Sequence, residues 1–174
     1  GAFQEGKALF DREQYALALA KLAPITSLEA VNDMVRYASF YYAVSAYLSN
    51  DASLAKGMFL QINERFPRWE KKDEVNFWLG KLSFEEQDYR QAIANLDKVK
   101  DSGMGEAIEK LTDFHLGQST DEALLADLLK ENPERTILAS QLANQILSKD
   151  IGEQDIDLLN ELAEKYALDL NIGV

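Results

Sequence analysis

The strongest constraint on the fold is a stretch of twenty residues that recurs at a fixed spacing. GKALFDREQYALALAKLAPI (6–25) and GKLSFEEQDYRQAIANLDKV (80–99) align without a gap at an offset of 74 residues. Half that offset leads to AVSAYLSNDASLAKGMFLQI (43–62), which keeps the same order of small and apolar positions. Three copies at a period of 37 residues predict a helical repeat array, in which each unit packs mainly against its neighbours.

Each copy is predicted to form two helices joined by a short polar turn. In the third copy, apolar residues at helical spacing predict helices over 71–86 and 89–100, with Gln87-Asp88 as the turn. Pro67 stands where a helix of the second copy must end. Small residues occupy the positions where the two helices of a pair must cross closely: Gly6, Ala43 and Gly80 on the first helix, and Ala18, Ala55 and Ala92 on the second.

Beyond residue 100 the repeat pattern decays but helical periodicity continues. Thr120, followed by the acidic Asp121 and Glu122, is predicted to cap one helix at its N-terminus. Terminal repeats are expected to be atypical because one face lacks a neighbour. We therefore expect two degenerate helical hairpins over 101–174, with helices at 105–117, 119–133, 134–150 and 152–169.

The third copy resembles the tetratricopeptide repeat. The resemblance covers residues 2–100 and rests on Leu79-Gly80, Phe84, Asp88-Tyr89, Ala92, Leu96 and Val99, with Pro67 at the terminal proline position of the second unit. It implies an all-α fold, a right-handed superhelix of antiparallel helix pairs with about ten helices. Residues 1–100 would form three repeats, the first truncated at its start, and residues 101–174 would continue and cap the stack. The period of 37 departs from the usual 34, so each connection is expected to be longer.

Charge narrows the choice of partner. The chain has 18 Lys and Arg against 30 Asp and Glu, giving a net charge of −12 and a pI near 4.5. Affinity for nucleic acid comes mostly from cations that neutralise phosphates, so this balance disfavours a nucleic-acid partner. No apolar run approaches the length that spans a bilayer, and no cysteine or signal peptide is visible. The abrupt ends lead us to expect that the sequence is cut from a longer polypeptide.

The resemblance also implies where a partner would bind. In tetratricopeptide arrays the first helix of each pair lines a concave groove that recognises peptides. Two readings stay open: an aromatic groove for an extended peptide or helix, with the lysines pairing to acidic groups, or ordinary inter-helix core with solvated lysines. Both tryptophans, Trp69 and Trp78, are expected to pack between successive repeats, and of the two Trp69, beside Arg68, is the one expected nearer the surface. The groove positions are Phe3, Lys7, Tyr37, Phe40, Tyr41, Val44, Phe77 and Lys81.

Nothing in the sequence predicts a catalytic, cofactor-binding or metal-binding residue. His115 is the single histidine and has no nucleophile or second metal ligand near it in sequence. Paired acids such as Glu85, Glu86 and Asp88 suit glycoside hydrolysis, but acidic helical repeats carry such pairs on solvated faces. We expect a non-catalytic scaffold that binds a protein or peptide. The alternatives are an all-helical enzyme using acidic residues and a repeat module that mainly self-associates.

A finer resemblance concerns bacterial envelope lipoproteins. YASFYYAVSAY (37–47), the segment 58–93 and LLKENPE (128–134) are similar to the N-terminal repeat region of such proteins. In some of them this region precedes a periplasmic-binding-protein-like domain, as in outer-membrane activators of peptidoglycan synthases. The resemblance implies a place at the periplasmic face of a bacterial membrane and an adjoining C-terminal domain, with the cytoplasm left open as an alternative.

Overall fold

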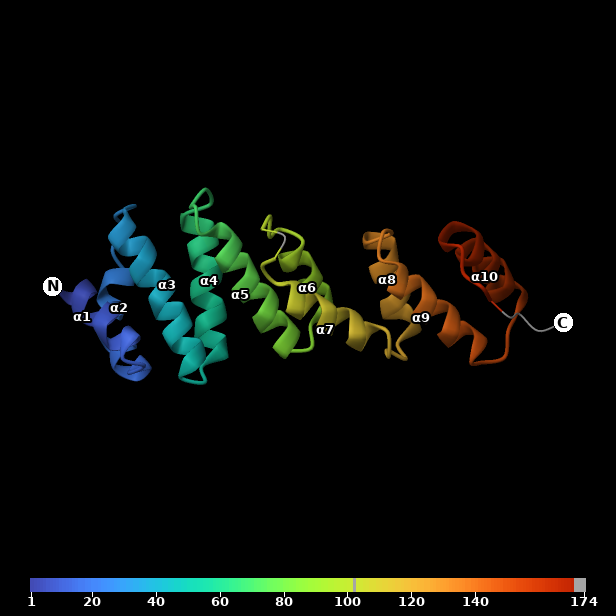
Figure 1. Ribbon diagram of the computed structural model, residues 1–174, viewed down its shortest axis with the longest axis horizontal. Coiled ribbons are helices and arrows are strands. Elements are labelled where there is room, and N and C mark those ends of the chain that lie inside the picture. Colours follow the sequence, from blue (N-terminus) through green and yellow to red (C-terminus); the bar gives the residue numbers. More distant parts are fainter. Residues whose placement is uncertain (102, 171–174) are drawn as a thin grey trace. The chain divides into compact units, whose positions relative to one another are not determined.

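The protein is all-helical in the computed structural model, which describes residues 1–101 and 103–170 (Figure 1). This confirms the expected all-α class with about ten helices, and the described residues contain no strand. The helices are α1 (Ala2–Asp11), α2 (Tyr15–Thr26), α3 (Asp33–Leu48), α4 (Ala52–Arg65), α5 (Lys72–Glu85), α6 (Tyr89–Leu96), α7 (Glu106–Leu116), α8 (Glu122–Glu131), α9 (Thr136–Leu147) and α10 (Glu153–Tyr166).

The chain divides into two compact units, Gly1–Ile108 (unit 1) and Glu109–Val174 (unit 2). Unit 1 consists of three helical hairpins, α1–α2, α3–α4 and α5–α6. The hairpins follow one another by contact of α2 with α3 and of α4 with α5 (Figure 1). The core of unit 1 runs through all three, from Ala18 and Leu22 of the first hairpin to Leu79 and Leu82 of the third.

The three hairpins turn in the same way. Residues Glu13, Asn50 and Gln87, one period apart, all have a left-handed backbone, with φ of 62°, 65° and 63°. The residue after each donates its N–H to a carbonyl five positions back, at 2.9 Å in every hairpin. This left-handed termination satisfies carbonyl groups that the end of a helix leaves without partners. In the second and third hairpins the next helix then begins with an Asp cap, Asp51 or Asp88, that accepts from a backbone N–H.

The two helices of a hairpin cross too closely for a larger residue. A Cβ added at Gly6 would lie 2.5 Å from Leu22 Cδ2, and one at Gly80 would lie 2.8 Å from Leu96 Cδ2. In the second hairpin the equivalent positions hold Ala43 and the flat ring of Phe59, both fully buried. The small side chains opposite, Ala18, Ala55 and Ala92, are fully buried as well.

Unit 2 is built around buried leucines of three helices. α9 packs against both α8 and α10, and Leu125, Leu138 and Leu159 are fully buried between them. The side chain of Arg135, just before α9, is only 9% exposed and forms ion pairs of 3.2 Å with Glu109 and Asp113 of α7. A nearly buried guanidinium needs such partners, because an uncompensated charge there is costly.

Several helix ends differ from the sequence expectation. α6 ends at Leu96 instead of continuing to residue 100, because the Asp73 carboxylate accepts the backbone N–H groups of Lys100 and Asp101 at 3.1 and 3.0 Å and holds that segment outside the helix. The cap of α8 is Asp121 instead of Thr120; the Asp121 carboxylate accepts from Leu124 N at 3.0 Å. The helices of residues 105–169 are each shorter than expected at both ends.

We expect Gly80→Ala to lower the free energy of unfolding by about 1–3 kcal/mol, because the added methyl group must displace Leu96. Urea denaturation measures this change. The matched control is Gly57→Ala in α4, where an added Cβ meets nothing within 4 Å. Since alanine favours a helix more than glycine does, the control should gain about 0.5–1 kcal/mol. Equal effects of the two substitutions would contradict the close crossing.

Candidate functional site

The first helices of the three hairpins bring the predicted aromatic positions to equivalent places. Phe3 of α1, Phe40 of α3 and Phe77 of α5 are all half-buried, as are Tyr37 and Tyr41 of α3. We refer to these five rings as the aromatic face. Half-burial means that each ring packs on neighbours and still keeps part of its surface accessible.

Tyr41 joins the rings of the first two hairpins into one cluster. Its ring centroid lies 6.4 Å from that of Phe3 and 5.0 Å from that of Phe10, both on α1. On its own helix it lies 6.2 Å from both Tyr37 and Phe40. Such aromatic pairs add stability beyond the area they bury, so these rings support one another.

Phe40 and Phe77 also reach the core. Phe40 meets the fully buried ring of Phe59 edge to face at 5.9 Å. Phe59 stacks on Trp78 at 5.7 Å with an interplanar angle of 10°, and Phe77 meets Trp78 at 5.9 Å. One side of each ring therefore packs inward, as the core reading expects, and the rest of its surface stays accessible.

Trp69 is buried, as expected for a tryptophan that packs between repeats. Its side chain is only 8% exposed, although of the two tryptophans it was the one expected nearer the surface. Its ring makes edge contacts with Tyr37 at 5.2 Å and with Phe40 at 6.1 Å. The adjoining Arg68 is exposed.

The two lysines of the groove prediction are already paired. Lys7 lies 3.2 Å from Asp11, and Lys81 lies 3.2 Å from Glu85. The hydrogen bond to Asp11 raises the pKa of Lys7. Each ammonium also stands over a tyrosine ring, Lys7 over Tyr41 at 5.9 Å and Lys81 over Tyr47 at 5.5 Å. An acidic group of a partner would have to compete with these internal carboxylates.

Val44 does not fit the predicted role. Its side chain is 6% exposed and belongs to the core of unit 1. Val44 does lie one period from Lys7 and from Lys81, but its side chain is short and branched and is buried. Val44 therefore offers almost no surface to a partner.

A polar link between the second and third hairpins was missed by the sequence reasoning. The Tyr47 hydroxyl donates to Glu85 Oε1 at 2.6 Å, and Glu85 also pairs with Lys81. Burial raises the pKa of Tyr47, and the hydrogen bond to Glu85 raises it further. Burial lowers the pKa of Lys81, but its hydrogen bond to Glu85 and the field of Tyr47 outweigh burial, and the net shift is upward. Glu85 lies one period plus one residue after Tyr47, and this spacing is the sequence signal that could have indicated the link.

The other candidates for chemistry have structural partners. Glu86 pairs with Lys56 at 2.9 Å, and Asp88 caps α6 by accepting from Gln91 N. His115 lies exposed in the last turn of α7, with its ring 5.8 Å from that of Phe114. Within residues 1–101 and 103–170 no three His, Cys, Asp or Glu side chains gather as a metal site would require. In the same residues no helix is long and apolar enough to cross a membrane.

Comparisons with known proteins leave the family open. No protein-family model matches the chain, and neither the curated proteins nor the solved structures contain a match.

Tyr47→Phe should lower the free energy of unfolding by about 0.5–1.5 kcal/mol at neutral pH, because it removes the hydrogen bond to Glu85. A phenol whose pKa is raised on folding contributes stability below the ordinary pKa of 10.0, and this contribution is lost as the pH rises above that value. Denaturation across the alkaline range should therefore show a smaller loss of stability in Tyr47→Phe than in the parent. Tyr42→Phe, which removes a hydroxyl that forms no hydrogen bond within residues 1–101 and 103–170, is the control, and an equal effect there would refute the link.

Proposed function

We propose that this chain is a non-catalytic tetratricopeptide-like scaffold that binds another protein through the aromatic face. The observation that carries the proposal is the row of half-buried rings on the first helices α1, α3 and α5. Large rings with accessible surface and few rotatable bonds are the side chains that contribute most to protein interfaces. The internal pairing of Lys7 and Lys81 leaves apolar area as the main source of affinity on this face.

The repeat geometry of unit 1 supports the tetratricopeptide assignment. The left-handed residues Glu13, Asn50 and Gln87 recur at the period of 37, as do the small residues at the helix crossings. A right-handed superhelix of antiparallel pairs would follow if each hairpin is rotated alike against the one before. That residues 101–174 continue and cap this stack stays a prediction.

We further propose that the chain is part of a bacterial envelope lipoprotein at the periplasmic face of a membrane, with an adjoining C-terminal domain. This proposal rests on the sequence resemblance alone. The enzyme alternative gains no support from Glu85, Glu86 and Asp88, since each of these carboxylates has a structural partner.

Phe77→Ala tests the aromatic face. Peptides selected from a random display library on the intact chain should bind the variant at least about fivefold more weakly, as measured by calorimetry, because an interface ring is lost. Phe77 is preferred to Phe40, since Phe40 also supports the buried Phe59 and Trp69.

Leu60→Ala is the matched control, because Leu60 is 51% exposed on the second helix α4. Its affinity for the selected peptides should equal that of the parent. If the selected peptides bind Phe77→Ala as tightly as they bind the parent, the binding surface lies elsewhere. If Phe77→Ala lowers the free energy of unfolding by several kcal/mol, the ring belongs to the core instead.

A further inference from the structure

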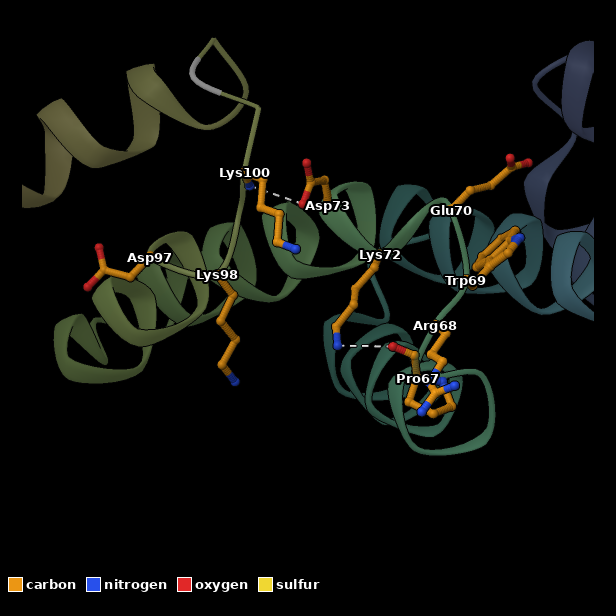
Figure 2. Close-up of a pocket in the computed structure, with 9 residues that line it drawn as sticks. All are labelled: Pro67, Arg68, Trp69, Glu70, Lys72, Asp73, Asp97, Lys98 and Lys100. Carbon is orange, nitrogen blue, oxygen red and sulfur yellow. Dashed lines mark hydrogen bonds between the residues drawn. The ribbon is translucent and has the colours of Figure 1, made fainter.

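A second surface of unit 1 differs from the aromatic face in its charge. The connection after α4 and the segment after α6 enclose a hollow of about 680 Å³. Four of its lining side chains are cationic: Arg68, Lys72, Lys98 and Lys100 (Figure 2). A chain with a net charge of −12 thus gathers four of its 18 basic residues around one cavity.

None of these four cations forms a direct ion pair with a carboxylate of the described residues. The Lys72 ammonium donates to the carbonyl of Pro67 at 3.0 Å, which leaves its charge uncompensated. The side chains of Arg68, Lys98 and Lys100 form no ion pair or hydrogen bond with any part of the chain that the structure describes. Several other lysines do pair with carboxylates, as Lys56 does with Glu86 at 2.9 Å.

Three carboxylates also line the hollow, so four positive charges face three negative ones and the formal net is +1, but the carboxylate oxygens make other contacts or point elsewhere. Both oxygens of Asp73 accept backbone N–H groups, those of Lys100 and Asp101. Glu70 accepts from the Tyr37 hydroxyl at 3.4 Å, and its carboxylate points away from Lys72 and Lys98 in Figure 2. The Asp97 carboxylate points to the far side of its segment, whereas Lys98 and Lys72 extend in a common direction.

The lining favours a peptide over a nucleic acid. Nucleic-acid sites of this size add faces of aromatic rings on which bases stack. The aromatic ring that lines this hollow, that of Trp69, is only 8% exposed and packs against Tyr37 and Phe40. Its faces are therefore not accessible for a base to stack on. A long polyphosphate would also be repelled by the net charge of −12, and a short acidic segment much less so.

We propose that this hollow binds an acidic segment of a partner polypeptide, whose carboxylates pair with Arg68, Lys72, Lys98 and Lys100. The contact is distinct from the aromatic face and requires none of its five rings. Ion pairs of this kind contribute mainly to the rate of association and to specificity, and they weaken as salt is added.

The test uses the intact ¹⁵N-labelled chain and an acetylated, amidated hexaglutamate peptide in about 0.01 M salt, where screening is weak. We expect saturable shifts of the backbone amides of Lys98 and Lys100 and of the Trp69 indole N–H. Replacing both lysines with glutamine (Lys98→Gln, Lys100→Gln) should weaken binding roughly three- to tenfold, since two exposed pairs are lost. These exposed substitutions leave the core intact, and the amide spectrum verifies this.

The matched control, Lys130→Gln with Lys165→Gln, makes the same change of charge in unit 2 and should bind hexaglutamate as the parent does. Equal weakening in both variants, or no shift at Lys98 and Lys100, would overturn the proposal. Inorganic phosphate that reproduces the shifts with equal affinity would assign the hollow to small anions. An oligothymidylate that binds the same residues more tightly than the peptide would assign it to nucleic acid. None of these outcomes bears on the aromatic face.

Discussion

The close crossing of the two helices in each hairpin is the constraint on which unit 1 depends. A Cβ at Gly6 or Gly80 would collide with the γ-branched Leu22 or Leu96, whereas Ala43 is accommodated where the opposite residue is the flat Phe59. The short distance lets three-residue turns with one left-handed residue join the helices, at 12–14, 49–51 and 86–88. Once the crossings repeat at one period, side chains one period apart must occupy equivalent places. The alignment of Phe3, Phe40 and Phe77 therefore follows from the spacing of the glycines and alanines.

Unit 1 carries two surfaces of different chemical character, the aromatic face and the hollow lined by Arg68, Lys72, Lys98 and Lys100. On the first helices the charges cancel internally, through Lys7 with Asp11 and Lys81 with Glu85, and the rings are left as the distinguishing feature. At the hollow the four cations form no direct ion pair in the described residues, because the Asp73 carboxylate accepts backbone N–H groups instead, and they outnumber the three lining carboxylates by one. A partner with apolar side chains and acidic residues would find a complementary feature at each surface.

The sequence predicted the features that depend on local spacing and missed those that depend on distant contacts. The period identified the hairpins, the turns around Glu13, Asn50 and Gln87, and the small residues at the crossings, since all of these are set within a single unit. The extent to which Trp69 is buried was not predictable, because its burial comes from Tyr37 and Phe40 of helix α3. The early end of α6 depends likewise on Asp73, and the pairing of Tyr47 with Glu85 joins two hairpins. For the candidate site, the positions of the rings were predictable, but the burial of Val44 was not.

The proposed binding surface is the set of half-buried rings that α1, α3 and α5 carry. Isotope-filtered NMR of the labelled chain with a bound, unlabelled selected peptide tests this claim directly. Intermolecular NOEs should connect the peptide to the ring protons of Phe3, Tyr41 and Phe77, on three different hairpins. NOEs confined to outward side chains of α2, α4 and α6, such as Leu17 and Leu60, would contradict the account.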